Sequence, residues 1–253
     1  MKDFFHLPVL AEEVLEGLCP KRNGRYADGT IGGGGHAELI LKAGTGSWLG
    51  GSDRDGAAVE AASSRLAPYA GRFEIRKGSF ASLADWIEPG SLDGVLLDLG
   101  VSSPQLDWPE RGFSLLQDGP LDMRMDVEQH MTAANIVNGE TEGKLADIIW
   151  QLGGERESRK IAKAIVRARE KNEIRTTKEL TDIVETVKPR RGKKTHPATK
   201  VFQALRIEVN NEFGELIQGL KSVSSLLKEG GRLAVITFHS GEDRIVKDYG
   251  RVE

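Results

Sequence analysis

The chain has 253 residues, 29% of them charged, and a formal net charge of −3. No apolar run is long enough to span a membrane, and the first six residues lack the apolar core of an export signal, so we expect a soluble, cytoplasmic protein. The single cysteine, Cys19, excludes an internal disulfide and a cysteine-based metal cluster.

Helical and strand-like patterns alternate over the first hundred residues. The expected helices are residues 7–18, 37–43 and 55–66, and the expected strands are a short run ending at Asp28, then 47–53, 73–76 and 92–98. This alternation predicts a parallel sheet with right-handed crossovers. Three carboxylates, Asp28, Asp53 and Asp98, fall at the ends of strands, which is where such sheets bind ligands.

The pattern changes at about Gly112. From there to Leu205 the apolar residues recur at helical spacing, and no convincing strand is found. We expect one long helix over Pro197–Leu227, ended by Gly230–Gly231, and then a strand over Arg232–Phe238. The sheet is therefore predicted to be interrupted by a helical insertion.

Charge is distributed unevenly along the chain. Residues 155–206 hold 16 Lys and Arg against 7 Asp and Glu, a local charge of +9 that leaves −12 for the remainder. Part of it lies in a basic loop, Pro189–Lys194. Such a segment indicates a polyanionic partner, although solvated helices are also often rich in Lys and Arg. We expect residues 1–111 and 206–253 to form the ligand-binding domain, and residues 112–205 to form a helical domain that binds the polyanion.

A cluster of four glycines, Gly32–Gly35, lies between the first strand and the helix that follows it. Glycines at this position let a ligand approach the backbone and the free amides of the helix. The pattern weakly fits the dinucleotide fingerprint. It also fits, with Thr30 in place of a glycine, the acidic loop of methyltransferases that use S-adenosylmethionine. The loop alone predicts a nucleotide-like cofactor, a simple flexible loop being the other interpretation, and Asp53 suits the ribose of either cofactor.

Several longer motifs follow in order. They are Asp98-Leu-Gly-Val-Ser-Ser-Pro-Gln105, Asp118-Gly-Pro-Leu-Asp-Met-Arg-Met-Asp126, His196-Pro-Ala-Thr-Lys200 and Phe238-His-Ser-Gly-Glu-Asp-Arg-Ile-Val-Lys247. Over nearly the whole chain they resemble the RsmH (MraW) family of bacterial methyltransferases. Members of this family use S-adenosylmethionine to methylate a cytosine N4 in the decoding region of small-subunit (16S) ribosomal RNA. The resemblance implies an α/β fold with a Rossmann-like class I methyltransferase sheet.

The resemblance also assigns cofactor contacts. Those expected to bind S-adenosylmethionine are Gly34, Gly35 and His36 at its methionine end and ribose, Asp53 at the ribose, Phe80 at the adenine, and Asp98 and Gln105 at its remaining groups. We expect direct transfer of the methyl group to N4 without a metal, because the histidines show no ligand spacing. No catalytic residue is assigned. His196 and His239 are either RNA or catalytic contacts, or helix caps.

Three features depart from the family pattern. Gly241 stands where the family usually has leucine, and Gly51–Ser52 weakens an expected strand. The chain also ends at Glu253, before the last strands of the family. The strand over Arg232–Phe238 is therefore expected to be an exposed edge, which favours self-association such as a homodimer. Two other functions remain open at this point: a catalytically silent RNA-binding assembly factor, and an oxidoreductase that uses NAD.

Overall fold

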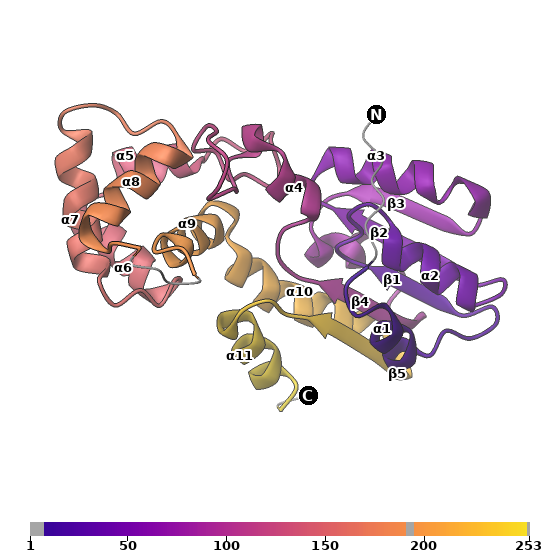
Figure 1. Ribbon diagram of the computed structural model, residues 1–253. Coiled ribbons are helices and arrows are strands. Elements are labelled where there is room, and N and C mark those ends of the chain that lie inside the picture. The colour runs from indigo at the N-terminus through magenta and orange to yellow at the C-terminus, as the bar shows by residue number, and fades with distance from the viewer. Residues whose placement is uncertain (1–7, 191–194, 252–253) are drawn as a thin grey trace. The chain divides into compact units, whose positions relative to one another are not determined.

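The computed structural model describes residues 8–190 and 195–251, which form two compact units (Figure 1). Unit 1 comprises Met1–Gly100 and Phe213–Glu253, and unit 2 comprises Val101–Glu212. Unit 2 is longer at both ends than the helical segment expected from the sequence. Leu7 and Arg191–Lys194, expected in a helix and in a basic loop, lie outside the described residues.

Unit 1 is built from alternating helices and strands. Its elements are α1 (Ala11–Leu18), β1 (Arg25–Asp28), α2 (Gly35–Ala43), β2 (Trp48–Asp53), α3 (Gly56–Arg65), the 3-10 turn η1 (Ala67–Tyr69), β3 (Phe73–Lys77), the 3-10 helix η2 (Phe80–Asp85), β4 (Leu92–Asp98), α10 (Glu212–Leu226), β5 (Leu227–Ile236) and α11 (Ser240–Tyr249). All five strands are parallel, in the order β3-β2-β1-β4-β5. This confirms the predicted α/β class and parallel sheet. Among the described strands, β5 lies at an edge, next to β4.

Apolar side chains cover both faces of the sheet. One layer packs α1, α2 and α3 against residues of the central strands that include Tyr26, Leu49 and Leu96. The opposite layer packs η2, α10 and α11 against Val95 and Leu97. Neighbouring residues of β4 thus point to opposite faces, which is why this strand is a continuous apolar run rather than an alternating one.

Strand β2 forms although it contains Gly50, Gly51 and Ser52, of which Gly51–Ser52 were expected to weaken it. A Cβ atom at Gly50 would lie 2.7 Å from the side chain of Ile87, and one at Gly51 would lie 2.4 Å from that of Ile31. Large side chains from outside the strand therefore occupy the space above these glycines. The strand forms because its neighbours supply the apolar volume that it lacks.

Three expected boundaries were wrong. The helix predicted over Pro197–Leu227 is two helices, because Asn211 adopts a left-handed conformation (φ 48°) between α9 and α10. The last strand starts at Leu227 rather than Arg232, since Gly230–Gly231 lie in an irregularity within β5 instead of ending a helix. Helix α1 starts at Ala11, after Leu10 in a left-handed conformation.

Unit 2 is helical around one apolar core. Its elements are α4 (Ser103–Asp107), the 3-10 turn η3 (Pro109–Arg111), α5 (Ala133–Gly139), α6 (Glu142–Gln151), α7 (Ser158–Arg169), α8 (Thr177–Val187) and α9 (Thr199–Asn210). The core draws on α5 to α9 and on Phe113, Leu121 and Met123 of the preceding loop. Within the described residues, the longest helix, α10 of unit 1, has 15 residues, and no helix has the length and apolar character needed to cross a membrane.

Candidate functional site

Three neighbouring strands of unit 1 end in carboxylates. In the sheet β1 lies between β2 and β4, with Asp28 opposite Gly51 on one side and Leu96 on the other. From these positions β2 and β4 each continue for two more residues, and they end at Asp53 and Asp98. The three carboxylates therefore meet at one edge of the sheet, as the strand ends predicted.

Asp28 is the most deeply buried of the three, with 1% of its surface exposed. Burial raises the pKa of its carboxyl to about 7, while the charge of nearby His36 and the hydrogen bond from the Thr30 amide act to lower it. The Thr30 amide donates to Asp28 Oδ1 over 3.1 Å. In turn, the Asp98 amide donates to the Thr30 hydroxyl over 2.6 Å. Thr30 therefore joins the ends of β1 and β4.

His36, in the first turn of α2, faces Asp98. Its Nε2 lies 3.6 Å from Asp98 Oδ2, and the imidazole is 7% exposed. Both ring nitrogens of His36, and Oδ1 of Asp98, are buried without a hydrogen-bond partner among the described residues. Buried polar atoms nearly always have partners, so these three atoms are suited to bind polar groups of a ligand.

Asp53 fixes the start of the glycine loop. Its Oδ2 accepts a hydrogen bond from the Gly32 amide (2.9 Å), and its Oδ1 accepts one from the Asp55 amide (2.9 Å). Burial raises the pKa of Asp53 to about 6, against the effect of these amides. The Arg54 amide also donates to this carboxylate, which still keeps a lone pair for a further donor, such as a ribose hydroxyl.

The glycines of the loop have different roles. Gly32 has φ 49°, and a Cβ there would find no atom closer than 3.9 Å, so space is open above it. At Gly34, with φ 77°, a Cβ would lie 3.1 Å from the backbone of Ala62 in α3. A Cβ at Gly35 would meet Pro8 at 2.9 Å. Gly34 and Gly35 therefore allow close packing within the protein, while Gly32 leaves room for a ligand.

The other two predicted cofactor contacts are Phe80 and Gln105. The ring of Phe80 packs in the core of unit 1, where a Cβ at Gly29 would be 2.5 Å from its Cβ and one at Gly219 would be 2.0 Å from its Cε2. Gln105 belongs to unit 2, where it is 5% exposed and its Oε1 accepts a hydrogen bond from the Ser102 amide (3.0 Å). The structure thus brings together Gly34, Gly35, His36, Asp53 and Asp98 in unit 1.

Two histidines have open roles, and one of them caps a helix. His239 Nδ1 accepts from the Glu242 amide (3.3 Å), and Glu242 accepts from the Phe238 and His239 amides, which closes a capping box at the start of α11. His196 Nδ1 accepts from the Ala198 amide (3.1 Å) in the turn before α9, and its Nε2 lies 3.1 Å from Glu185 Oε1, but no side chain caps α9. The capping interpretation is therefore favoured for His239 alone.

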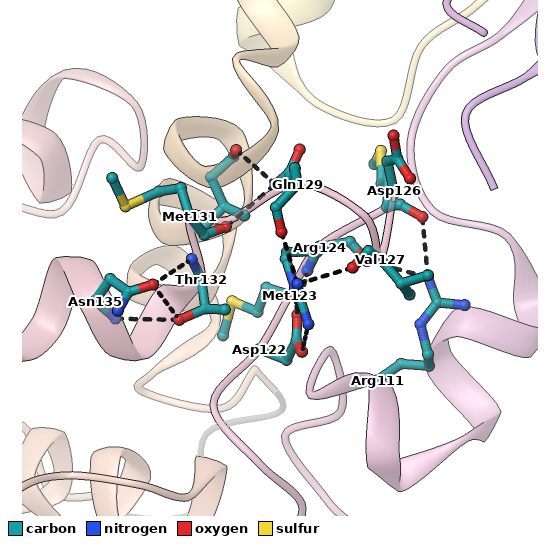
Figure 2. Close-up of polar contacts among 12 residues, drawn as sticks. Arg111, Asp122, Met123, Arg124, Asp126, Val127, Gln129, Met131, Thr132 and Asn135 are labelled. Carbon is teal, nitrogen blue, oxygen red and sulfur yellow. Dashed lines mark hydrogen bonds and ion pairs between the residues drawn. The ribbon is translucent and has the colours of Figure 1, made fainter.

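In unit 2, two arginines hold the loop that contains the Asp118–Asp126 motif (Figure 2). Arg124 binds both carboxylate oxygens of Asp122 at 2.8 Å and donates to the carbonyls of Val127 and Gln129. Arg111 donates to the carbonyls of residues 124 and 125. A loop without regular structure thus has its carbonyls satisfied by guanidinium groups, one of them from Arg124 within the motif and one from Arg111 before it.

The sequence alone missed the role of Thr30. In the sequence pattern it stands in place of a glycine, whereas in the structure its hydroxyl and amide connect Asp98 to Asp28. The spacing Asp28-x-Thr30 is typical of an Asx turn, and this signal would have found the first of the two contacts. Chemically, the site offers carboxylates, an imidazole and an open glycine backbone, all suited to a polar ligand that carries hydroxyl and amino groups.

Comparison with known proteins gives a consistent result. The profile of the MraW methylase family matches residues 3–252. A protein named ribosomal RNA small subunit methyltransferase H from Trichlorobacter lovleyi is 51% identical over 98% of this chain and 81% of its own length. A protein of the same name from Stenotrophomonas maltophilia is 52% identical over 96% of this chain and 76% of its own. Among solved structures, a putative rRNA methylase from Clostridium thermocellum aligns with a TM-score of 0.34 and 17% identity, over 39% of this chain and 54% of that one, which is too weak to support an argument.

Proposed function

Because the chain belongs to the MraW methylase family, we propose that it transfers a methyl group from S-adenosylmethionine to the exocyclic N4 of a cytidine in the decoding region of small-subunit (16S) ribosomal RNA. The observation that best supports this proposal is the set of buried, unpartnered atoms of His36 and Asp98 beside the glycine loop. An RNA methyltransferase needs such a site for its methyl donor. Family membership also argues against an oxidoreductase that uses NAD.

The residues of unit 1 fit S-adenosylmethionine. Asp53 offers carboxylate lone pairs to the ribose hydroxyls, Gly32 leaves its backbone open, and His36 and Asp98 offer buried polar atoms to the amino-acid end. When bound, this cofactor supplies a methyl group on a positively charged sulfur, which an amine can displace. Nearby carboxylates favour that positive charge. The assignments of Phe80 and Gln105 remain proposals that rest on the resemblance.

The protein contributes orientation more than acid–base chemistry. The backbone of Asp98 is fixed by its bond to Thr30, and its Oδ2 lies 3.6 Å from His36 Nε2, so its unpartnered Oδ1 has a defined position at the end of β4. An acceptor held there can align a donor group such as an amine, and alignment of reacting groups contributes several kcal/mol to catalysis. No residue of the chain is required to form a covalent intermediate.

Methyl transfer from labelled S-adenosylmethionine to small ribosomal subunits that lack this modification tests the proposal. Label recovered in N4-methylcytidine is the expected result. The Asp53→Asn variant should bind the cofactor more weakly, whereas the control Asp182→Asn, which changes an exposed carboxylate on α8, should not. If the unmodified protein binds cofactor and RNA but transfers no label, the chain is instead a catalytically silent assembly factor.

We also propose that unit 2 binds the RNA through one face of α7. This unit contains the helical domain that the sequence predicts over residues 112–205. Many cations of this unit already have partners: Lys188 pairs with Glu155, and Arg169 donates to two backbone carbonyls. In contrast, Arg159, Lys163 and Arg167 are exposed and make no hydrogen bond or ion pair with another described residue. Their spacing of four residues puts them in one row, about 6 Å apart along the helix.

Phosphate contacts make RNA binding depend on salt, with each contact to a single strand contributing about 0.7 to the slope of log K against log salt. Changing Arg159, Lys163 and Arg167 together to glutamine should therefore lower the slope by about 2. A control that changes three paired cations of unit 2 instead, Lys144, Arg175 and Lys178, should lower it much less. Equal slopes for the two triple variants would refute the role of α7.

The remaining assignments follow from this function. We propose that the protein acts in the cytoplasm, where its partner is the small ribosomal subunit or the RNA within it. Because β5 lies at an edge of the described sheet, pairing of two copies through this strand to form a homodimer is also proposed. Sedimentation of the purified protein at several concentrations would test the homodimer.

A further inference from the structure

Phe238 is an exposed aromatic residue in unit 1. It follows β5, and 55% of its surface is accessible to solvent. The other described aromatic residues of unit 1 are buried or half-buried. Singly exposed apolar side chains are common on protein surfaces, so the exposure of this ring assigns no role by itself; its position beside the candidate site does.

The ring lies beside the end of β4. Asp98 is opposite Ile236 in the sheet, and the Leu99 amide donates to the Ile236 carbonyl over 3.0 Å. Two residues after Asp98, a Cβ atom at Gly100 would lie 3.1 Å from Cδ2 of Phe238. The ring therefore rests on a backbone without a side chain, two residues beyond Asp98. Gly100 also has φ 103°, which favours glycine.

The backbone that carries the ring is fixed. The amide of Phe238 donates to Glu242 Oε2 over 2.8 Å, as part of the capping box of α11. Glu242 itself is 2% exposed. The ring thus lies against Gly100, and its backbone is anchored at the start of α11. Little conformational entropy is therefore lost when a ligand binds the ring.

We propose that Phe238 stacks on the target cytosine and holds the base beside Asp98. The proposal rests on the methyltransferase activity proposed above. An enzyme that modifies a base must take the base out of its stack, and an aromatic side chain replaces the lost stacking partner. A ring that is exposed, anchored and next to the strand end of the cofactor site meets this need. Because every base can stack on an aromatic ring, this contact positions the cytosine but does not distinguish it from other bases.

The test compares Phe238→Leu with Phe238→Tyr, which keeps an aromatic face, and with Ile217→Ala, which changes another exposed apolar residue of unit 1. Loss of one stacked base should lower kcat/KM for the small subunit by about 5- to 150-fold in Phe238→Leu. Phe238→Tyr and Ile217→Ala should stay near the unmodified protein. The dissociation constant for S-adenosylmethionine should be the same in all four proteins.

A second measurement separates this proposal from the activity itself. An RNA fragment with the fluorescent base pyrrolocytosine at the target position should lose fluorescence when it binds the unmodified protein or Phe238→Tyr, but not Phe238→Leu. If the unmodified protein transfers no methyl group, the proposed activity fails, and the fluorescence still tests the ring. Equal quenching by Phe238→Leu, or weaker cofactor binding in that variant, would overturn the proposal.

Discussion

The buried carboxyl of Asp28 makes the stability of unit 1 depend on pH in an unusual direction. Most carboxylates in proteins stabilise the fold as pH rises, because their pKa is lowered on folding. Burial instead raises the pKa of Asp28 from an ordinary value of 3.8 to about 7. Between these two values the folded protein holds a proton that the unfolded chain releases. The free energy of unfolding should therefore fall as pH rises from about 4 to about 7.

The size of the effect follows from the shift. A difference of about 3 pKa units corresponds to about 4 kcal/mol, at roughly 1.4 kcal/mol per unit. Asp28→Asn keeps an oxygen that accepts from the Thr30 amide but cannot ionise. The variant should therefore be more stable than the unmodified protein by up to about 4 kcal/mol at pH 8, and the advantage should shrink toward zero near pH 4.

Urea unfolding from pH 5 to pH 8, followed by tryptophan fluorescence in a protein whose Trp108 and Trp150 of unit 2 are changed to Phe, measures this difference through Trp48 and Trp86 of unit 1. Asp93→Asn is the control. Burial acts to raise the pKa of Asp93, but the Arg25 amide and Lys228 outweigh it and lower the pKa. That variant should be less stable by an amount that is constant over this range, because the carboxylate is ionised throughout. A constant difference for Asp28→Asn as well would refute the argument from burial.

Three further predictions concern packing and hydrogen bonds. Gly219→Ala puts a methyl group 2.0 Å from the Phe80 ring and should lower the Tm, whereas Gly143→Ala, with no atom within 4 Å, should not. Thr30→Val removes the acceptor for the Asp98 amide; calorimetry should detect weaker binding of S-adenosylmethionine, with Thr30→Ser close to the unmodified protein. Arg124→Ala leaves Asp122 unpaired and should destabilise unit 2 by about 2 kcal/mol in urea, unlike Arg175→Ala, which breaks only an exposed pair.

Local patterns in the sequence predict most of the sheet. The run Leu92–Asp98 is long, apolar and ends in a carboxylate, so both its burial and its place in the site follow from the sequence. The break at Asn211 does not follow, because apolar residues continue at helical spacing across it and a single left-handed residue leaves no trace in that period. The early start of β5 was missed for a related reason. Glycines usually end helices, but here they form an irregularity inside a strand.

The sequence predicts that three carboxylates meet at one edge of the sheet, but not how they are connected to their neighbours. Strand ends placed Asp28, Asp53 and Asp98 at one edge because parallel strands share a direction, which is a property of topology. The contact of His36 with Asp98 depends on how α2 packs on the sheet. Such packing brings together residues that are 62 positions apart, and no local pattern encodes it.

The order of the strands has a consequence for synthesis of the protein. Strand β4 occupies the interior of the sheet, but its neighbour β5 begins at Leu227, after the whole of unit 2. At about 5 to 20 residues per second, the ribosome needs roughly 6 to 26 seconds to make the approximately 130 residues between these strands. During this time β4 has an open edge, while unit 2, which has its own core, is being synthesised. The nascent chain is therefore most prone to wrong strand pairing, and most in need of a chaperone, while its helical unit is being made.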